Sequence, residues 1–284
     1  MEHHTIEVPD GRTVGVAEYG APEGKAVLWC HGGPGSRLEP IHLDSGAVEA
    51  GLRLIGVDRP GYGLSAPQPG RTVASWVPDA LAVADHLGID DFVTVGVSTG
   101  GAYALAVAAL APERVRGVVA CCAMTDMRCQ PARATMSPRH AHAVWDAPDR
   151  AGAIAAAIDS HGLDGSKLFT GDAPALAASD LDLFADPEWM KQIRATVPAM
   201  FAHGLDGYAD DRIADGPGWV TFDVESITCP VIVVHGRSDI IVDVIHAEHT
   251  AAIVPNAELR VFDELGHFSI ETEVLPAIID LLRR

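Results

Sequence analysis

A serine stands between two glycines in the stretch G-V-S-T-G, residues 96–100. The apolar run 92–95 before it is typical of a buried strand, and the residues from Thr99 onward are typical of a helix. A sharp strand-to-helix turn holds a serine hydroxyl out of the sheet, and the flanking glycines avoid steric clashes there. The pattern therefore predicts that Ser98 is a nucleophile. A plain glycine-rich turn with a serine helix cap is the alternative, and the strand and helix on either side disfavour it.

A serine hydroxyl needs a general base, and the base needs a carboxylate that orients it. His267 follows the apolar run 259–262, and Asp239 follows the run 231–234. Each would lie at the carboxyl end of a strand, where α/β sheets place their sites. The order Ser98, Asp239, His267 is the nucleophile–acid–histidine order of one hydrolase class. We therefore predict that His267 is the base and that Asp239 is its acid.

Two other aspartates compete for the role of the acid. Asp126 follows the apolar run 118–122, one strand earlier than Asp239. Asp243 lies four residues beyond Asp239, on the predicted helix that follows. An aspartate in a turn is by itself more often a turn former or a helix cap. We favour Asp239 because it and His267 follow successive strands.

A glycine-rich stretch, H-G-G-P-G at residues 31–35, follows the apolar run 26–30. Glycines at the end of a strand let backbone amides face a concave site, as an oxyanion hole requires. We predict that the amides of Gly33 and Thr99 form this hole, and a plain strand-end turn is the alternative. A phosphate-binding loop is disfavoured, since the sequence has neither a Gly-Lys-Ser/Thr ending nor a GxGxxG pattern.

Strand and helix patterns alternate along the chain and would position these residues. Residues 5–8 and 13–17 alternate apolar and polar side chains around an Asp-Gly step, which predicts a hairpin. Apolar runs typical of buried parallel strands follow at 26–30, 52–57, 92–97, 115–120, 231–234 and 259–262. Helical patterns lie at 74–87, 99–110, 244–253 and 269–282. This order predicts an α/β fold with a mostly parallel central sheet flanked by helices.

One long gap interrupts this alternation. From about Met124 to Ile227 no buried strand is predicted, and helical pieces such as 151–158 and 188–201 occur instead. So long a stretch without structure would be implausible inside a compact domain. We therefore expect residues 1–123 and 228–284 to form a core domain and residues 124–227 to form a helical insertion.

The composition limits the classes of function. Of the 284 residues, 48% are hydrophobic and 21% are charged, which allows a buried core and excludes a disordered chain. The 20 Lys and Arg against 39 Asp and Glu give a formal charge of −19. Such acidity argues against nucleic-acid binding and against electrostatic docking on anionic membranes. We expect a small-molecule substrate as the partner, and the oligomeric state stays open.

The cysteines and the N-terminus bear on compartment and cofactors. The five cysteines are odd in number and include no CxxC pair, which favours buried free thiols over disulfides. No secretory signal pattern is present at the N-terminus, and the apolar helix at 102–111 is too short to cross a bilayer. We therefore expect a cytoplasmic protein. Without an HExxH pattern or cysteine pairs at ligand spacing, neither a metal nor a cofactor is predicted.

These pieces together resemble the α/β-hydrolase fold superfamily over nearly the whole chain. The matching pieces are the loop 31–35, the stretch D-R-P-G-Y-G-L-S at 58–65, Ser98 in its turn, Asp239 and His267. The resemblance implies a structural role for 58–65 and a helical cap over the active site at 124–227. Epoxide hydrolases and haloalkane dehalogenases of this fold use an aspartate where this chain has Ser98. The resemblance is therefore to a serine-nucleophile, esterase-like member.

The loop 31–35 is similar to that of proline iminopeptidases, which usually carry G-G-S-W-G at the turn where this chain has G-V-S-T-G. The resulting hypothesis is a serine hydrolase that cleaves a small or medium carboxylic ester or lactone through an acyl-enzyme. It would use a triad of Ser98, His267 and Asp239. A proline iminopeptidase-like aminopeptidase, a C–C bond hydrolase and a ligand-binding protein without turnover are the alternatives.

Overall fold

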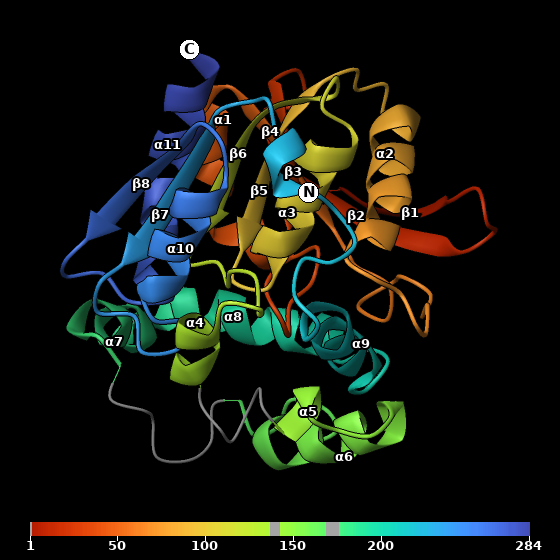
Figure 1. Ribbon diagram of the computed structural model, residues 1–284. Helices are drawn as coiled ribbons and strands as arrows, with labels where there is room; N and C mark the ends of the chain where they lie inside the picture. The colour runs from red at the N-terminus through yellow and green to blue at the C-terminus, as the bar shows by residue number, and fades with distance from the viewer. Residues whose placement is uncertain (1, 137–142, 169–175) are drawn as a thin grey trace.

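The computed structural model describes residues 2–136, 143–168 and 176–284, which surround one eight-stranded sheet (Figure 1). The strands are β1 (Glu2–Glu7), β2 (Thr13–Gly20), β3 (Lys25–Cys30), β4 (Leu52–Val57), β5 (Phe92–Val97), β6 (Val115–Cys121), β7 (Val231–Gly236) and β8 (Ala257–Phe262). Their order across the sheet is β1-β2-β4-β3-β5-β6-β7-β8. The β1–β2 and β2–β4 pairs are antiparallel, and the remaining pairs are parallel. The predicted fold class is confirmed.

The central strands are buried on both faces, as their continuous apolar runs predict. All six residues of β5 and all six of β7 are buried, because helices cover the sheet on either side. The β1–β2 hairpin turns at Gly11, whose φ of +82° is the left-handed conformation expected from the Asp-Gly step. Strand register is thus fixed by burial in the middle of the sheet and by a tight turn at its edge.

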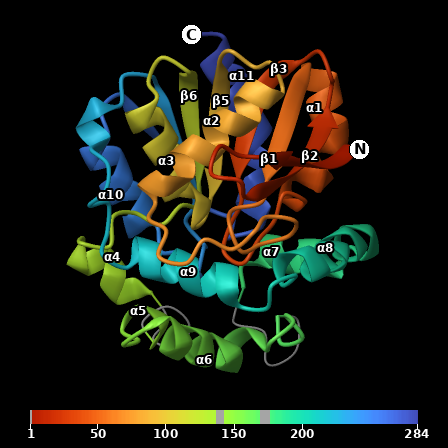
Figure 2. The ribbon, with the colours of Figure 1, turned by 90° about the vertical axis from the view of Figure 1, so that its right-hand side faces the viewer.

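Helices pack on both faces of the sheet (Figures 1 and 2). One apolar cluster joins the sheet to α1 (Asp44–Ala50) and α11 (Val274–Leu282). Another joins it to α2 (Val77–His86), α3 (Gly100–Leu110) and α10 (Ile245–Ile253). Short 3-10 turns occur at Glu39–Leu43, Ala74–Trp76, Val224–Ser226 and Ser269–Glu273. In α3, every residue from Gly100 to Ala109 is buried, so the helix that follows Ser98 is held rigidly in the core.

The chain between β6 and β7, residues 122–230, is here called the β6–β7 segment. Its helices are α4 (Gln130–Thr135), α5 (Ala143–Trp145), α6 (Arg150–His161), α7 (Ala178–Ala185), α8 (Pro187–Met200) and α9 (Asp206–Asp215). They lie at the edge of the sheet where the parallel strands end, with α5 and α6 farthest from it (Figures 1 and 2). The predicted pieces 151–158 and 188–201 correspond to α6 and α8, whereas no sequence pattern predicts α9.

No helix in the described ranges is long and apolar enough to cross a bilayer.

Candidate active site

Ser98 lies on the turn between β5 and α3, with φ at +52°. A non-glycine residue adopts this conformation at a cost of about 1–3 kcal/mol. The Ser98 amide donates to the Cys121 carbonyl at 2.9 Å, which ties the turn to β6. A Cβ at Gly100 would overlap the carbonyl oxygen of Cys30, and a Cβ at Gly96 would overlap that of Gly100. Close packing therefore requires both glycines, and the strained turn expected from G-V-S-T-G is present.

The amides of Gly33 and Thr99 lie beside this turn. A Cβ at Gly33 would stand 2.8 Å from Thr99 Oγ1, so the two residues are in close contact. Neither amide donates a hydrogen bond to any residue that the structure describes. The neighbouring amide of Gly32 is instead bound by the Glu39 carboxyl group at 2.9 Å. Two unoccupied amides next to Ser98 are what the binding of an oxyanion requires.

Glu39 holds the loop 31–35 from a half-buried position. Besides the Gly32 amide, it accepts the indole N–H of Trp29 at 2.7 Å. Burial and the nearby Glu271 raise the pKa of Glu39 to about 7. The carboxyl group that positions this loop therefore changes its charge close to neutral pH.

Asp239 and His267 lie together, as predicted. Asp239 Oδ2 is 2.7 Å from His267 Nδ1, and Asp239 Oδ1 accepts the amides of Ile241 and Val242 at 2.8 and 2.9 Å. Burial lowers the pKa of His267, but the Asp239 carboxylate outweighs burial and raises that pKa well above 6.5. Burial raises the pKa of Asp239, but the imidazole and the amides lower it below 3.8. With Nδ1 bound to the carboxylate, Nε2 is left to accept a proton.

Ser98 Oγ makes no hydrogen bond with the His267 ring, although the structure describes both residues. Such contacts are often long before a substrate binds.

A third group, Cys122 Sγ, lies beside the Asp239–His267 pair. The ligand atoms of Cys122, Asp239 and His267 all lie within 4.8 Å of one another. In the described part of the chain, these three form the one cluster whose spacing could hold a metal ion.

Cys122 is a site residue that the sequence did not reveal. It follows β6 with φ at +40°, and burial raises the pKa of its thiol well above 9.0. The thiol is therefore uncharged at neutral pH. Asp239 is therefore the charged group that raises the pKa of His267, and contact with the Cys122 side chain raises that pKa further.

The two competing aspartates bind other partners. Asp126 Oδ2 accepts a hydrogen bond from Arg128 Nη2 at 2.5 Å, and Asp126 Oδ1 accepts one from the amide of Trp219 at 3.2 Å. Asp243 accepts the amide of Ile245, at the start of α10, at 2.9 Å. Of the three candidate acids, Asp239 is the one whose carboxylate bonds to the ring of His267.

Arg212 of α9 also belongs to the site and was missed by sequence reasoning. Its Nη2 donates to Thr99 Oγ1 at 2.5 Å and pairs with Asp215 Oδ2 at 2.6 Å. Its Nη1 lies 3.4 Å from Met124 Sδ, and the residue is only 3% exposed. The sequence of α9, D-G-Y-A-D-D-R-I-A-D, has no apolar periodicity that would signal a helix.

Asp180 of α7 is a further missed residue, which supports the backbone at His267. Its carboxylate accepts the amides of His267 at 2.9 Å, Phe268 at 3.2 Å and Ser269 at 2.8 Å. A Cβ at Gly266 would overlap this carboxylate, so the glycine before His267 is what lets Asp180 approach. The β6–β7 segment thus contacts the site at Thr99 through α9 and at His267 through α7.

Comparison with known proteins gives a consistent result. Residues 25–274 match the family model described as the alpha/beta hydrolase fold. The chain is similar to 2-hydroxymuconate semialdehyde hydrolase of Pseudomonas putida, with 29% identity over 87% of this chain and 82% of that protein. It is also similar to a probable proline iminopeptidase of Leptolyngbya boryana, with 25% identity over 96% of this chain and 90% of that protein.

Among solved structures, an enol-lactonase from Burkholderia xenovorans LB400 matches with a TM-score of 0.73. The match covers 99% of this chain and 100% of the other, at 19% sequence identity. At that identity the likeness concerns the fold.

Proposed function

Because the chain belongs to the alpha/beta hydrolase fold family, we propose that it is a serine hydrolase that cleaves small or medium carboxylic esters or lactones. The observation that carries the proposal is the pairing of Asp239 with His267 at 2.7 Å, together with the strained turn at Ser98. Family membership supports hydrolysis in general, since the fold hosts several chemistries.

The proposed reaction begins when Ser98 Oγ attacks the carbonyl carbon and His267 Nε2 takes the hydroxyl proton. Asp239 holds the imidazole through Nδ1 and stabilises its positive charge. The amides of Gly33 and Thr99 would bind the oxyanion, each contributing about 3–4 kcal/mol to lowering the barrier. The proton then passes to the leaving alkoxide, which departs and leaves an acyl group on Ser98. Water activated by His267 attacks this ester, and the carboxylic acid is released.

As part of this proposal, residues 124–227 act as a helical cap on a core formed by residues 1–123 and 228–284. Contacts of α9 with Thr99 and of α7 with the backbone of His267 support it. A cap in this position would shape the acyl or alcohol subsite and limit the access of water. The five free cysteines support a cytoplasmic location within the same proposal.

The test is the hydrolysis of 4-nitrophenyl butyrate by wild-type protein and by Ser98→Ala. We expect kcat/KM to fall by at least about a thousandfold, because the nucleophile is lost. Undiminished hydrolysis in Ser98→Ala would refute the mechanism. For the acid, Asp239→Asn is compared with Asp126→Asn, which removes the same charge from a residue bound to Arg128. A large loss confined to Asp126→Asn would transfer the role to that residue.

Two related functions are separated by a substrate panel. The similarity to 2-hydroxymuconate semialdehyde hydrolase favours C–C bond hydrolysis as the second candidate, and the probable proline iminopeptidase favours a third. Purified protein is assayed with short acyl esters, a lactone series, 2-hydroxymuconate semialdehyde and proline naphthylamide under one set of conditions. The proposal predicts the highest kcat/KM on an ester or a lactone. A higher value on either of the other two would replace it.

A further inference from the structure

Arg212 is a buried cation whose hydrogen-bonding capacity is only partly used. Nη2 binds Thr99 and Asp215, whereas Nη1 faces the thioether sulfur of Met124, a weak acceptor. Nε is buried and has no hydrogen-bond partner among the described residues. A buried donor left without an acceptor costs about 1–3 kcal/mol. An oxygen-rich ligand at Arg212 would relieve that cost.

The guanidinium lies directly beside the nucleophile turn. Thr99, which accepts from Nη2, is the residue after Ser98, and the amide of Met124 donates to the Ser98 carbonyl at 3.3 Å. Both nitrogens at the end of the Arg212 side chain therefore contact residues that are joined to Ser98. Asp211, the preceding residue of α9, would lie 3.4 Å from a Cβ at Gly33. This face of α9 thus borders the proposed oxyanion site.

Several buried guanidinium groups lie next to this site. Arg59 and Arg71 both pair with Asp211, and Arg212 pairs with Asp215. All five side chains are buried, and among them three guanidinium groups face two carboxylates. A buried guanidinium in a low-dielectric environment attracts an anion, even though the whole chain carries a formal charge of −19.

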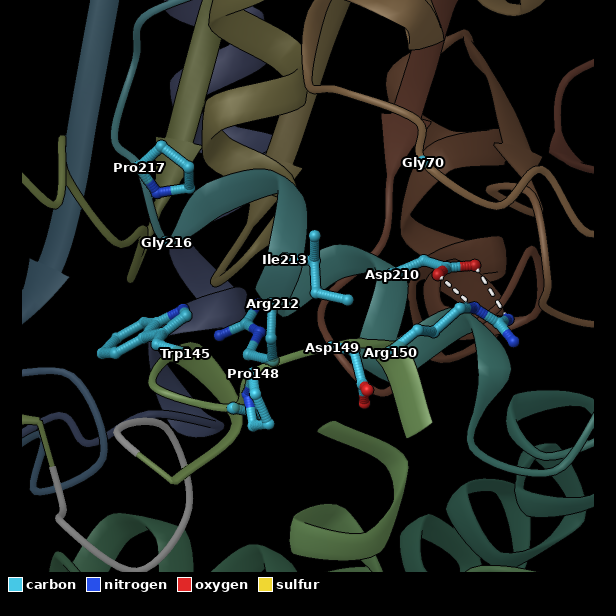
Figure 3. Close-up of a pocket in the computed structure, with 11 residues that line it drawn as sticks. Gly70, Trp145, Pro148, Asp149, Arg150, Asp210, Arg212, Ile213, Gly216 and Pro217 are labelled. Carbon is cyan, nitrogen blue, oxygen red and sulfur yellow. Dashed lines mark hydrogen bonds and ion pairs between the residues drawn. The ribbon is translucent and has the colours of Figure 1, made fainter. Parts of the chain in front are cut away.

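A cavity of about 470 Å³ lies between α9 and the loop that joins α5 to α6, and Arg212 is among the residues that line it (Figure 3). Apolar walls come from Trp145, Pro148 and Ile213, and Arg212 extends from α9 toward Trp145 and Pro148 (Figure 3). This volume suits a small organic molecule. Arg150 also lines the cavity, but Asp210 binds both its Nε at 2.6 Å and its Nη2 at 3.1 Å.

We propose that Arg212 binds a carboxylate group of the substrate, so that this hydrolase takes esters or lactones that also carry a carboxylate. The inference rests on the proposed function and specifies its substrate class. A guanidinium matches a carboxylate in geometry and in charge. With the carboxylate at Arg212, the scissile carbonyl would lie toward Ser98, one residue from Thr99.

The experiment compares two methyl esters of similar length, monomethyl glutarate with a carboxylate at its far end and neutral methyl pentanoate. Methanol release is measured for wild-type protein, Arg212→Gln, Arg212→Lys and the control Arg150→Gln. We expect wild type to favour monomethyl glutarate by at least about tenfold in kcat/KM. Arg212→Gln should lower kcat/KM for monomethyl glutarate at least about tenfold more than it lowers kcat/KM for methyl pentanoate. Arg212→Lys should recover part of the loss, and Arg150→Gln should leave both values within about twofold.

The outcomes separate this inference from the proposed function. Equal cleavage of the two esters by wild type, with equal losses in Arg212→Gln, would overturn the carboxylate site and leave the ester hydrolase standing. If neither ester is cleaved, calorimetry of monomethyl glutarate decides. A dissociation constant that Arg212→Gln raises about 100-fold supports the site while the ester function fails. Absence of binding overturns the site.

Folding of the variants does not limit the test. Should Arg212→Gln fail to fold, inhibition of the wild type by glutarate is compared with inhibition by glutaramide, its neutral analogue of the same shape. Stronger inhibition by glutarate, by at least about tenfold, supports the inference. Equal inhibition by the two compounds overturns it.

Discussion

Two buried aspartates join the β6–β7 segment to the rest of the fold, and they differ in what they bind. Asp211 of α9 accepts hydrogen bonds from two arginines and two tyrosines of the core. Asp180 of α7 accepts backbone amides and one serine hydroxyl from the loop that carries His267. One carboxylate therefore neutralises buried charge, and the other orients a stretch of backbone.

The Asp211 cluster is defined as Asp211 with Arg59, Arg71, Tyr62 and Tyr103. The arginines approach to 2.8 and 2.6 Å, and both phenols donate at 2.7 and 2.8 Å. Burial raises the pKa of Asp211, but the two guanidinium groups hold it well below 3.8. Such a cluster is costly to break because its members cannot reach water.

The comparison indicates that the contacts of α9 mainly stabilise the fold, whereas those of α7 mainly position the backbone at His267. Removing Asp211 leaves Arg59 and Arg71 buried without a counter-charge. Removing Asp180 leaves neutral backbone amides without hydrogen-bond acceptors. The first change should mainly affect folding. The second should mainly affect the geometry of His267.

The largest expected effect is that of Asp211→Ala on stability. Arg59 and Arg71 would be left buried without their carboxylate, which should lower the free energy of unfolding by about 3–5 kcal/mol. Urea unfolding followed by circular dichroism measures it. Since the pKa of Asp211 is lowered by folding, its contribution is present above pH 3.8 and is lost as pH falls through the folded-state value. A loss below about 1 kcal/mol would contradict the view that this cluster holds the segment.

Asp180→Ala should have a smaller effect on stability and a clear effect on turnover. Loss of the acceptor for neutral amides should cost about 1–3 kcal/mol. Release of the backbone at His267 should lower kcat ten- to hundredfold, since small displacements of a base are costly. KM should change little, because the residue touches the His267 loop and no part of the proposed carboxylate site. Steady-state kinetics at a temperature where the variant is folded checks this prediction. An unchanged kcat would mean that Asp180 contributes to stability and not to turnover.

A pH profile separates the two ways in which His267 is supported. His267 must be neutral to accept a proton, and Asp239 raises its pKa well above 6.5. The acid limb of kcat/KM should therefore lie above pH 6.5, with activity lost as pH falls through it. Asp239→Asn should move this limb to lower pH, because the charge that raises the pKa of His267 is removed. Asp180→Ala should lower kcat/KM at every pH without changing the pH at which the acid limb lies. A shift of the acid limb in that variant would contradict the view that Asp180 positions the backbone while Asp239 sets the pKa of His267.

Much of the sheet could be predicted from the sequence, because strands buried on both faces leave continuous apolar runs. The same runs placed Ser98, Asp239 and His267 at strand ends, and the structure brings the last two together at 2.7 Å. Their catalytic roles remain predictions. Asp239 could be preferred over Asp126 only through the order of strands along the chain, since the two aspartates are chemically alike.

The Asp211 cluster could not be predicted, and the reason is physical. Helix α9 buries charged side chains, so it lacks the apolar stripe by which amphipathic helices are found. Its partners are distant in sequence: Arg59 lies 152 residues from Asp211. The stretch 58–65 was given a structural role from its resemblance alone, and no local pattern shows which carboxylate its arginine binds. Cys122 was missed for a similar reason, since it ends an apolar strand and nothing marks its φ of +40°.

The smallest expected effect is the difference in stability between two tyrosine variants, one of which belongs to the Asp211 cluster. Tyr62→Phe removes a hydroxyl that donates to Asp211 at 2.7 Å, and the matched control Tyr19→Phe removes one that donates to the Arg37 carbonyl at 3.4 Å. Both tyrosines are buried, so the comparison isolates the charge of the acceptor and the length of the bond. We expect a loss of about 1.5–3 kcal/mol for Tyr62→Phe and below about 1 kcal/mol for Tyr19→Phe. Equal losses of the free energy of unfolding in the two variants would mean that Asp211 stabilises the fold through its arginine partners alone.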